Sequence, residues 1–477
     1  MTLDSSARPE STDAPAAPET SGRRSTWSAL RPLVLRLHFY AGVLVAPLLL
    51  IAAVSGLLYA LSYQAEKIVY AHELTVPVGD ETVPLSQQVH AAKKVNPNGT
   101  VTAVWPSAEP GATTRVLMDD PDVEEGKSLA VFVDPYTGEV RGQLPSYGGS
   151  GALPVRTWLS EFHANLKLGE TGRLYSETAA SWMWVVALGG LALWIGRRRK
   201  ARRELFVPER GPKSRRRTLS WHGSLGLWAA AGLLGLSATG LTWSTYAGEN
   251  IDLVRAQLDG ATPTVSAVIG EGGEGGSGHE GHAGHGGGAA APAATGPDVG
   301  VDKVVEAARA AGIDGSMSVV LPAEGKGYVV KETDTQFPVH LDSVAVNPAD
   351  GTVMDELRFA DYPLLAKLTR FGIDAHSGVF LGLVNQLALA ALALALILLV
   401  VWGYRMWWLR RPGRPVARGA WRKVPPTVLL PLLAGTALVG WFVPLLGISL
   451  LVFLAVDVAL GLAARARSRS GDPAARH

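Results

Sequence analysis

The chain has 477 residues, 47% of them hydrophobic, and its formal net charge is only +2. A charge this close to balance provides no strong field toward nucleic acid, so we exclude a nucleic-acid-binding protein. Cysteine is absent, which excludes disulfides, thiolate metal sites, cysteine-held iron–sulfur clusters and thiol nucleophiles.

Long apolar runs dominate the chain after its first 30 residues. Residues 1–30 are rich in Pro, Ala, Ser and Thr, which predicts a disordered cytoplasmic tail and not a cleaved signal peptide. Each later run lacks Lys, Arg, Asp and Glu and can supply the roughly 20 apolar residues of a membrane helix. The runs are residues 37–65, 178–196, 218–248, 375–404 and 424–456. The sequence therefore predicts a polytopic α-helical membrane protein.

Basic segments give the orientation, because Lys and Arg concentrate in cytoplasmic loops. Residues 197–217 carry eleven Lys or Arg against two Glu, and residues 405–423 carry seven and no acid. The N-terminus is basic too, so the first four spans alternate outward and inward. The last apolar stretch is too long for one helix, and Pro444 predicts a break within it. We expect six spans.

These boundaries divide the chain into membrane, external and cytoplasmic segments. They are a tail at 1–30, a span at 31–65, an external segment at 66–160, a span with an outer extension at 161–196, a basic loop at 197–217, a span at 218–246, an external segment at 247–370, a span at 371–409, a basic loop at 410–424, an extra helical hairpin at 425–464 and a tail at 465–477. We expect a bacterial cytoplasmic (inner) membrane, with both termini in the cytoplasm.

The two external segments resemble each other. One contains SLAVFVDPYTGEV and the other HLDSVAVNPADGTV. Both patterns predict a strand, a tight turn with Pro at its first corner and Gly at a positive φ, and a returning strand. A helical stretch precedes each hairpin, so each segment is expected to form an α+β module.

The second external segment also carries an insert at 270–296 that contains GHEGHAGHGGG. Its histidines, His279, His282 and His285, are three residues apart in a glycine-rich stretch that does not favour a helix. Histidine-rich tracts of this kind can bind divalent metal, and this is a weak candidate metal site. The alternative, a flexible linker, is the one we favour.

Histidines recur in the outward spans with fixed spacing. Each is followed by glycines four and eighteen residues later: His38, Gly42 and Gly56, then His222, Gly226 and Gly240. Eighteen residues make five whole helical turns, so the histidine and the distal glycine share one face.

The inward spans repeat a second pattern. His163 and His376 each precede a glycine by six residues and a tryptophan, Trp194 or Trp407, by 31 residues. The architecture is therefore expected to be a duplicated unit of outward helix, external module and inward helix.

The four histidines sort by depth into two pairs. His38 and His222 are near the cytoplasmic side, and His163 and His376 are near the outer side. Paired imidazoles at two levels suit the axial ligation of two b-type haems. The glycines fit this interpretation, because a flat porphyrin needs a helix face without side chains: Gly42 and Gly226 for the inner haem, Gly56 and Gly240 for the outer one. Basic side chains placed to pair with propionates are Arg36, Arg156 and Arg370.

Other interpretations of these residues stay open. An intramembrane histidine can form an interhelical hydrogen bond, and glycines are common packing residues in membrane helices. A proton relay would need carboxylates, and the predicted spans offer only Asp457.

In these motifs the chain resembles the PepSY-associated transmembrane proteins, which include iron-regulated membrane proteins and ferric-siderophore reductases. The resemblance covers about residues 30–410 and rests on L-H-x-x-x-G near the start and on FHANLKLGETGR before the second span. It implies PepSY-like external modules, two haem b groups held by the four histidines, and reduction of a ferric chelate or siderophore outside. The insert and the last two spans depart from the family pattern.

The implied function is transmembrane electron transfer in iron acquisition. The chain has no Gly-rich dinucleotide fingerprint, so the donor is expected to be quinol from the lipid bilayer or a separate cytoplasmic reductase. The main alternative is a membrane-anchored PepSY-type regulatory or binding module, for example in peptidase regulation, without redox chemistry. A metal transporter ranks third. The matched membrane histidines favour electron transfer over the regulatory alternative, because a regulator does not need them.

Overall fold

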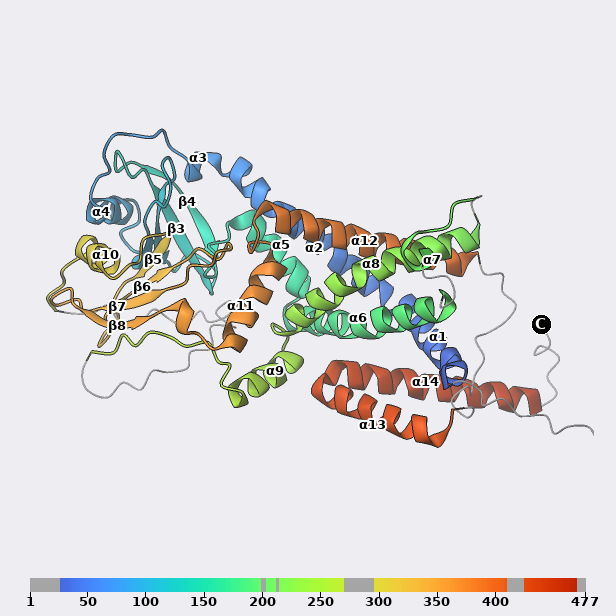
Figure 1. Cartoon of the computed structure of the whole chain (residues 1–477). Coiled ribbons are helices and arrows are strands. Elements are labelled where there is room, and N and C mark those ends of the chain that lie inside the picture. The colour runs from blue at the N-terminus through green and yellow to red at the C-terminus, as the bar shows by residue number, and fades with distance from the viewer. Residues whose placement is uncertain (1–25, 199–202, 212–213, 270–295, 410–423, 470–477) are drawn as a thin grey trace, which may run out of the picture.

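The computed structural model describes residues 26–198, 203–211, 214–269, 296–409 and 424–469. Figure 1 shows a bundle of long helices with a β-sheet at one end of it. The helices α2, α6, α8 and α12 pack against one another, and α1 packs against α6. Short helices connect the long helices of the bundle to the sheet domain.

Within the described ranges, five helices are long and apolar enough to cross a membrane. They are α2 (Ala46–Val69), α6 (Gly169–Arg198), α8 (Arg215–Leu241), α12 (Leu383–Trp408) and α14 (Pro444–Arg469). A shorter apolar helix, α13 (Pro426–Phe442), precedes α14. The fifth predicted span therefore corresponds to a helix of 17 residues.

The first predicted span is made of two helices, α1 (Thr26–Leu44) and α2, which meet at Val45. The hydrogen bonds from Val45 N to Ala41 O and from Leu49 N to Val45 O continue across the junction. Pro47 causes the local break, because it has no N–H to donate to the carbonyl of Val43. The hydroxyl of Tyr404 in α12 donates to that carbonyl at 2.9 Å.

The domain at one end of the bundle is built around one eight-stranded antiparallel sheet. Its strand order is β4-β3-β2-β1-β5-β6-β7-β8. The strands are β1 (Thr100–Trp105), β2 (Thr114–Asp119), β3 (Lys127–Val133), β4 (Val140–Tyr147), β5 (Met317–Val320), β6 (Tyr328–Glu332), β7 (Ser343–Val346) and β8 (Val353–Leu357). The two predicted modules are therefore halves of one sheet, joined where Val104 in β1 pairs with Val319 in β5.

Both halves use the predicted turn. Gly138 N donates to Asp134 O and Gly351 N donates to Asn347 O, each at 2.9 Å. The two glycines have φ of 74° and 78°, a conformation that favours glycine. Helices α4 (Leu85–Val95) and α10 (Val301–Ala310) cover one face of the sheet and share one hydrophobic core with it (Figure 1). This core spans both halves.

Short helices connect this domain to the bundle. They are α3 (Ala71–Leu74), α5 (Pro154–Asn165), α9 (Tyr246–Gln257), the 3₁₀ turn η2 (Phe359–Asp361) and α11 (Leu364–Ser377). The short helix α7 (Arg203–Phe206) lies between α6 and α8 at the opposite end of the bundle (Figure 1). The prediction that His163 and His376 extend the inward spans is wrong. His163 lies on α5 and His376 on α11, and left-handed residues separate these helices from α6 and α12.

The C-terminal hairpin lies beside the bundle (Figure 1). α13 ends at Phe442 and α14 begins at Pro444, where the sequence predicts a break. Three side chains attach the hairpin to the other helices. Asp457 accepts from Arg36, and Trp182 Nε1 donates to Ser449 Oγ at 2.8 Å. Asn250 Nδ2 donates to the carbonyl of Phe442 at 2.9 Å.

Candidate functional site

The inner histidines face each other across the bundle. His38 from α1 and His222 from α8 have ring centres 6.5 Å apart, with the ring planes at 73°. Their Nδ1 atoms are 3.0 Å from the carbonyl oxygen of Val186 and 3.1 Å from that of Leu399. A carbonyl only accepts, so each Nδ1 carries the hydrogen and each Nε2 keeps its lone pair.

The outer histidines repeat this arrangement on different helices. His163 and His376 have ring centres 6.4 Å apart, at 56°. Their Nδ1 atoms contact hydroxyl oxygens, Ser55 Oγ at 2.9 Å and Thr239 Oγ1 at 2.8 Å. Both hydroxyl hydrogens have carbonyl acceptors in their own helices, so the oxygens can accept from Nδ1–H. Nε2 is again the nitrogen with a free lone pair.

The separation of each pair suits one metal ion bound from both sides. Metal–imidazole bonds of about 2 Å, plus about 1 Å from each nitrogen to its ring centre, place two ring centres about 6 Å apart. A ligating histidine usually donates its other ring N–H to a carbonyl or another fixed acceptor, as all four do here. Throughout the described ranges, no group of three or more His, Asp or Glu gathers as a metal site.

Glycines let three of these rings approach a neighbouring helix closely. A Cβ on Gly190 would lie 3.0 Å from His38 Cε1, and one on Gly56 would lie 3.3 Å from His163 Cε1. A Cβ on Gly240 would lie 3.2 Å from His376 Cε1. The neighbours of Gly56 and Gly240 are therefore imidazole rings.

The two inner glycines of the sequence pattern have more space. A Cβ on Gly42 would meet no atom of the described residues within 4 Å, and one on Gly226 would meet only Leu399 Cδ2, at 3.6 Å. The helix face at Gly42 is therefore open enough for a flat group to lie against it, whereas the face at Gly226 is in contact with the side chain of Leu399.

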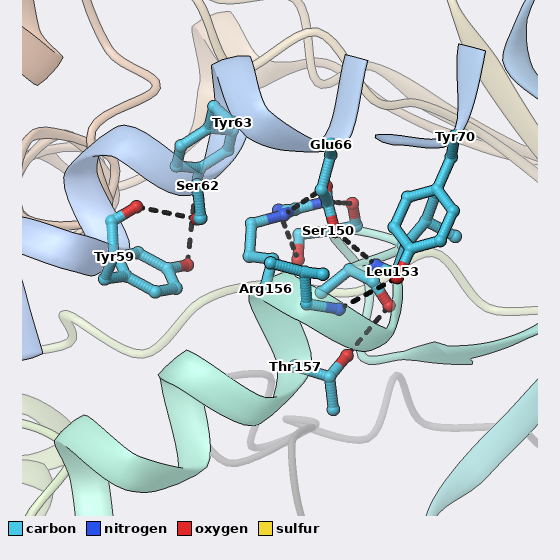
Figure 2. Close-up of polar contacts among 12 residues, drawn as sticks. Tyr59, Ser62, Tyr63, Glu66, Tyr70, Ser150, Leu153, Arg156 and Thr157 are labelled. Carbon is cyan, nitrogen blue, oxygen red and sulfur yellow. Dashed lines mark hydrogen bonds and ion pairs between the residues drawn. The ribbon is translucent and has the colours of Figure 1, made fainter. Parts of the chain in front are cut away.

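The three predicted propionate partners each hold a carboxylate of the chain. Arg36 pairs with Asp457. Arg370 Nε lies 2.8 Å from Asp374 Oδ2, one helical turn away. The third pair, Arg156 with Glu66, joins α5 to α2 (Figure 2). A propionate that bound any of these arginines would share it with a carboxylate.

The Arg156 pair sits in a buried polar network (Figure 2). Glu66 Oε2 accepts from Arg156 Nε at 2.8 Å, and Glu66 Oε1 accepts from the N–H of Leu153, which caps the start of α5. The Arg156 guanidinium lies 4.6 Å from the ring centre of Tyr63. Burial alone would lower the pKa of Arg156, but the charge of Glu66 and its hydrogen bond, together with Tyr63 and Tyr59, outweigh burial, so the pKa lies above its ordinary value. The network fixes the helix that carries His163.

Several residues around the histidines are not signalled by the sequence pattern. Ser55 and Thr239 are ordinary hydroxyl residues of apolar helices, and the acceptors at Val186 and Leu399 are backbone atoms. Glu177 corrects the expectation that Asp457 is the only carboxylate in the spans: it is buried in α6 and accepts from Ala247 N at 2.9 Å. His279, His282 and His285 lie outside the described residues.

Comparison with known proteins gives one family. A family model described as the PepSY-associated TM region matches residues 35–410, which include all four paired histidines. No curated protein matches the chain. The match covers most of the chain, and the apolar helices agree with it. The chain is therefore a multi-pass membrane protein and belongs to the family of the PepSY-associated TM region.

Proposed function

We propose that the protein binds two haem b groups and carries electrons through the membrane to an external ferric chelate, such as a ferric siderophore. The observation that supports this most is the arrangement of the histidines. Two pairs of histidines have ring-centre separations of 6.5 and 6.4 Å, and every Nδ1 has a hydrogen-bond partner. Two imidazoles on opposite sides of one iron are a known ligand set for electron-transfer haem.

Each residue then has a defined part. Nε2 of His38 and His222 would hold the inner haem iron, and Nε2 of His163 and His376 the outer one. Haem supplies a one-electron couple, and two protein ligands leave no open position for oxygen chemistry. The chain fixes the rings through Nδ1 and leaves an open helix face at Gly42, and Gly226 is proposed to clear the inner haem as well. Arg36, Arg156 and Arg370 are proposed to attract the propionates.

The two pairs lie at different depths. Gly56 lies against the ring of His163 and so marks the level of the outer pair. It follows His38 by eighteen residues along α1 and α2, a rise of about 27 Å at 1.5 Å per residue. The basic segments support a cytoplasmic position for the inner pair and for both termini. Electrons would enter there from quinol or a cytoplasmic reductase and leave beside the sheet, from a bacterial inner membrane.

Matching positions in the two halves support an origin by duplication. His163 precedes Val186 and Gly190 by 23 and 27 residues, and His376 precedes Leu399 and Gly403 by the same numbers. Both carbonyls bond an inner histidine. Likewise Ser55 and Thr239 stand directly before Gly56 and Gly240 and bond the outer histidines.

A membrane-anchored regulatory module is the second candidate, supported by the large external sheet. The test is a reduced-minus-oxidised visible spectrum of purified protein, with haem quantified per chain. We expect about two low-spin haems, the inner one lost in His38→Ala and the outer one in His376→Ala. His90→Ala, an exposed position on α4, serves as control and should keep both. Absence of haem after expression with ample haem would reject the electron-transfer function and favour the regulatory one.

A further inference from the structure

The inner and outer histidine pairs differ in the atom that accepts from Nδ1. Both inner histidines bond backbone carbonyls, those of Val186 and Leu399. Both outer histidines bond side-chain hydroxyls, those of Ser55 and Thr239, and the carbonyls of Ala52 and Leu236 also act on these two rings. A hydroxyl partner is present at both outer histidines and at neither inner one, so it separates the two levels.

A carbonyl acceptor is also present at the outer level, behind each hydroxyl. Ser55 Oγ donates to the carbonyls of Ile51, at 2.8 Å, and Ala52, at 3.1 Å. Ala52 stands four residues before Gly56, as Val186 stands four residues before Gly190. The helix geometry at the outer ring therefore matches the inner one, with a hydroxyl interposed.

Thr239 repeats this arrangement on α8. Its Oγ1 donates to the carbonyls of Gly235, at 2.8 Å, and Leu236, at 3.2 Å. Leu236 stands four residues before Gly240, against which the His376 ring packs. The Nδ1–H of each outer histidine thus contacts a hydroxyl. That hydroxyl donates to the carbonyl four residues before the glycine, Ala52 or Leu236, as Val186 stands four residues before Gly190 at the inner level.

The group that accepts the Nδ1–H hydrogen bond affects the reduction potential of a metal bound to Nε2 of the same ring. A backbone carbonyl is a stronger acceptor than an alcohol oxygen, so it draws the Nδ1 hydrogen further and leaves more negative charge on the ring. That charge stabilises ferric iron relative to ferrous iron and lowers the reduction potential. A hydroxyl acceptor has a smaller effect.

We infer that Ser55 and Thr239 tune the outer haem, raising its midpoint potential above that of the inner haem and so directing electrons outward. This inference rests on the proposed function. It assigns the two hydroxyls a role as positioning and tuning residues, which act on the iron only through His163 and His376.

The chain offers a reciprocal test at the inner level. Gly189 occupies, relative to Val186, the place that Ser55 occupies relative to Ala52. A Cβ on Gly189 would lie 3.6 Å from His38 Cβ and 3.8 Å from His38 Nδ1, which are ordinary contacts. Gly189→Ser therefore brings a hydroxyl within reach of the inner Nδ1, and Gly189→Ala adds the same carbon without it.

The experiment is a spectroelectrochemical titration of the haem-loaded full-length protein, with each midpoint assigned from the His38→Ala and His376→Ala variants. Native protein should have its higher midpoint at the outer haem. Ser55→Ala and Thr239→Val leave the carbonyls of Ala52 and Leu236 as the acceptors of Nδ1–H, so the outer midpoint should fall while the inner one stays. We expect the equilibrium constant for inner-to-outer transfer to fall about tenfold, equivalent to 59 mV for one electron. Gly189→Ser, but not Gly189→Ala, should raise the inner midpoint.

The outcomes separate the two claims. Protein that binds no haem contradicts the proposed function itself. Two haems with the outer midpoint at or below the inner one, or unmoved in the hydroxyl variants, overturn the tuning role and leave the proposed function standing. If a hydroxyl variant loses the outer haem, the Gly189→Ser variant provides the test. If this variant keeps both haems and its inner midpoint is unchanged, the inference is overturned.

Discussion

The hydroxyl of Tyr404 donates to the backbone carbonyl of Val43, 2.9 Å away in another helix. This carbonyl would otherwise have no partner, because the residue four positions later is Pro47. The contact thus completes the backbone hydrogen bonding at the junction of α1 and α2, between His38 on one side and Ser55 on the other.

We therefore predict that Tyr404→Phe lowers the free energy of unfolding by roughly 1–2 kcal/mol, because it leaves a buried carbonyl unbonded. Thermal unfolding in detergent measures the loss. The matched control is Tyr175→Phe, which removes a bond of 3.1 Å to the carbonyl of Leu48, a carbonyl that keeps its regular helical partner. An equal loss in both variants would contradict the role assigned to Pro47.

The buried pair of Arg156 and Glu66 gives a second prediction. Glu66→Gln keeps an oxygen for the N–H of Leu153 but removes the charge opposite Arg156. An unpaired buried charge costs about 3–5 kcal/mol, so the variant should unfold at a clearly lower temperature. The double variant Glu66→Gln, Arg156→Met should recover part of the loss. Additive losses in the double-mutant cycle would show that the two side chains are not coupled.

The open helix face at Gly42 gives a third prediction. Because no described atom lies near its added Cβ, Gly42→Leu should leave the helix packing intact and obstruct the inner haem. Haem per chain should fall from about two to about one, with the outer haem retained. Gly235→Leu, on an exposed face of α8, should keep both. Two haems in Gly42→Leu would contradict a haem surface at Gly42.

Glu332, on β6 outside the membrane helices, gives a pH prediction. Burial raises the pKa of this carboxyl, although the N–H of Asp342 opposes the shift. A raised folded pKa means that the folded state binds the proton more tightly than the unfolded state, whose pKa is about 4.3. Stability is therefore fully present below that value and is lost as the pH rises through the folded pKa.

Glu332→Gln cannot ionise and can still accept from the N–H of Asp342. Its melting temperature relative to the native protein should therefore increase between pH 4 and pH 8. Glu306→Gln, at an exposed position of α10, should show no such trend. A constant difference for Glu332→Gln across this range would contradict the raised pKa.

Local patterns predicted much of this fold. Uncharged apolar runs specify membrane helices by length and composition alone, and the proline at Pro444 marks a helix start in the structure as in the sequence. The turn residues Asp134 and Gly138 specify a hairpin because their conformational preferences are strong and local. The pairing of histidines by depth follows from the same apolar runs.

Other features depend on contacts between distant segments. The break after His163 needs positive φ at Leu166 and Lys167, residue types that do not signal such a conformation. Ser55 bonds its own helix as serines in apolar helices usually do, so its contact with His163 is visible only after the helices pack. Glu177 likewise has its partner 70 residues away, at the start of α9.

The pairing of β1 with β5 has a consequence for shorter versions of this chain. β4 and β8 are the outer edges of the sheet, and β1, which contains the fully buried Val104, lies in its interior. A polypeptide ending after the first four strands would expose β1 as a free edge with unpaired backbone groups. The simplest way to cover it is the same edge of another molecule, so a half-length chain should self-associate through the strand that here unites two halves.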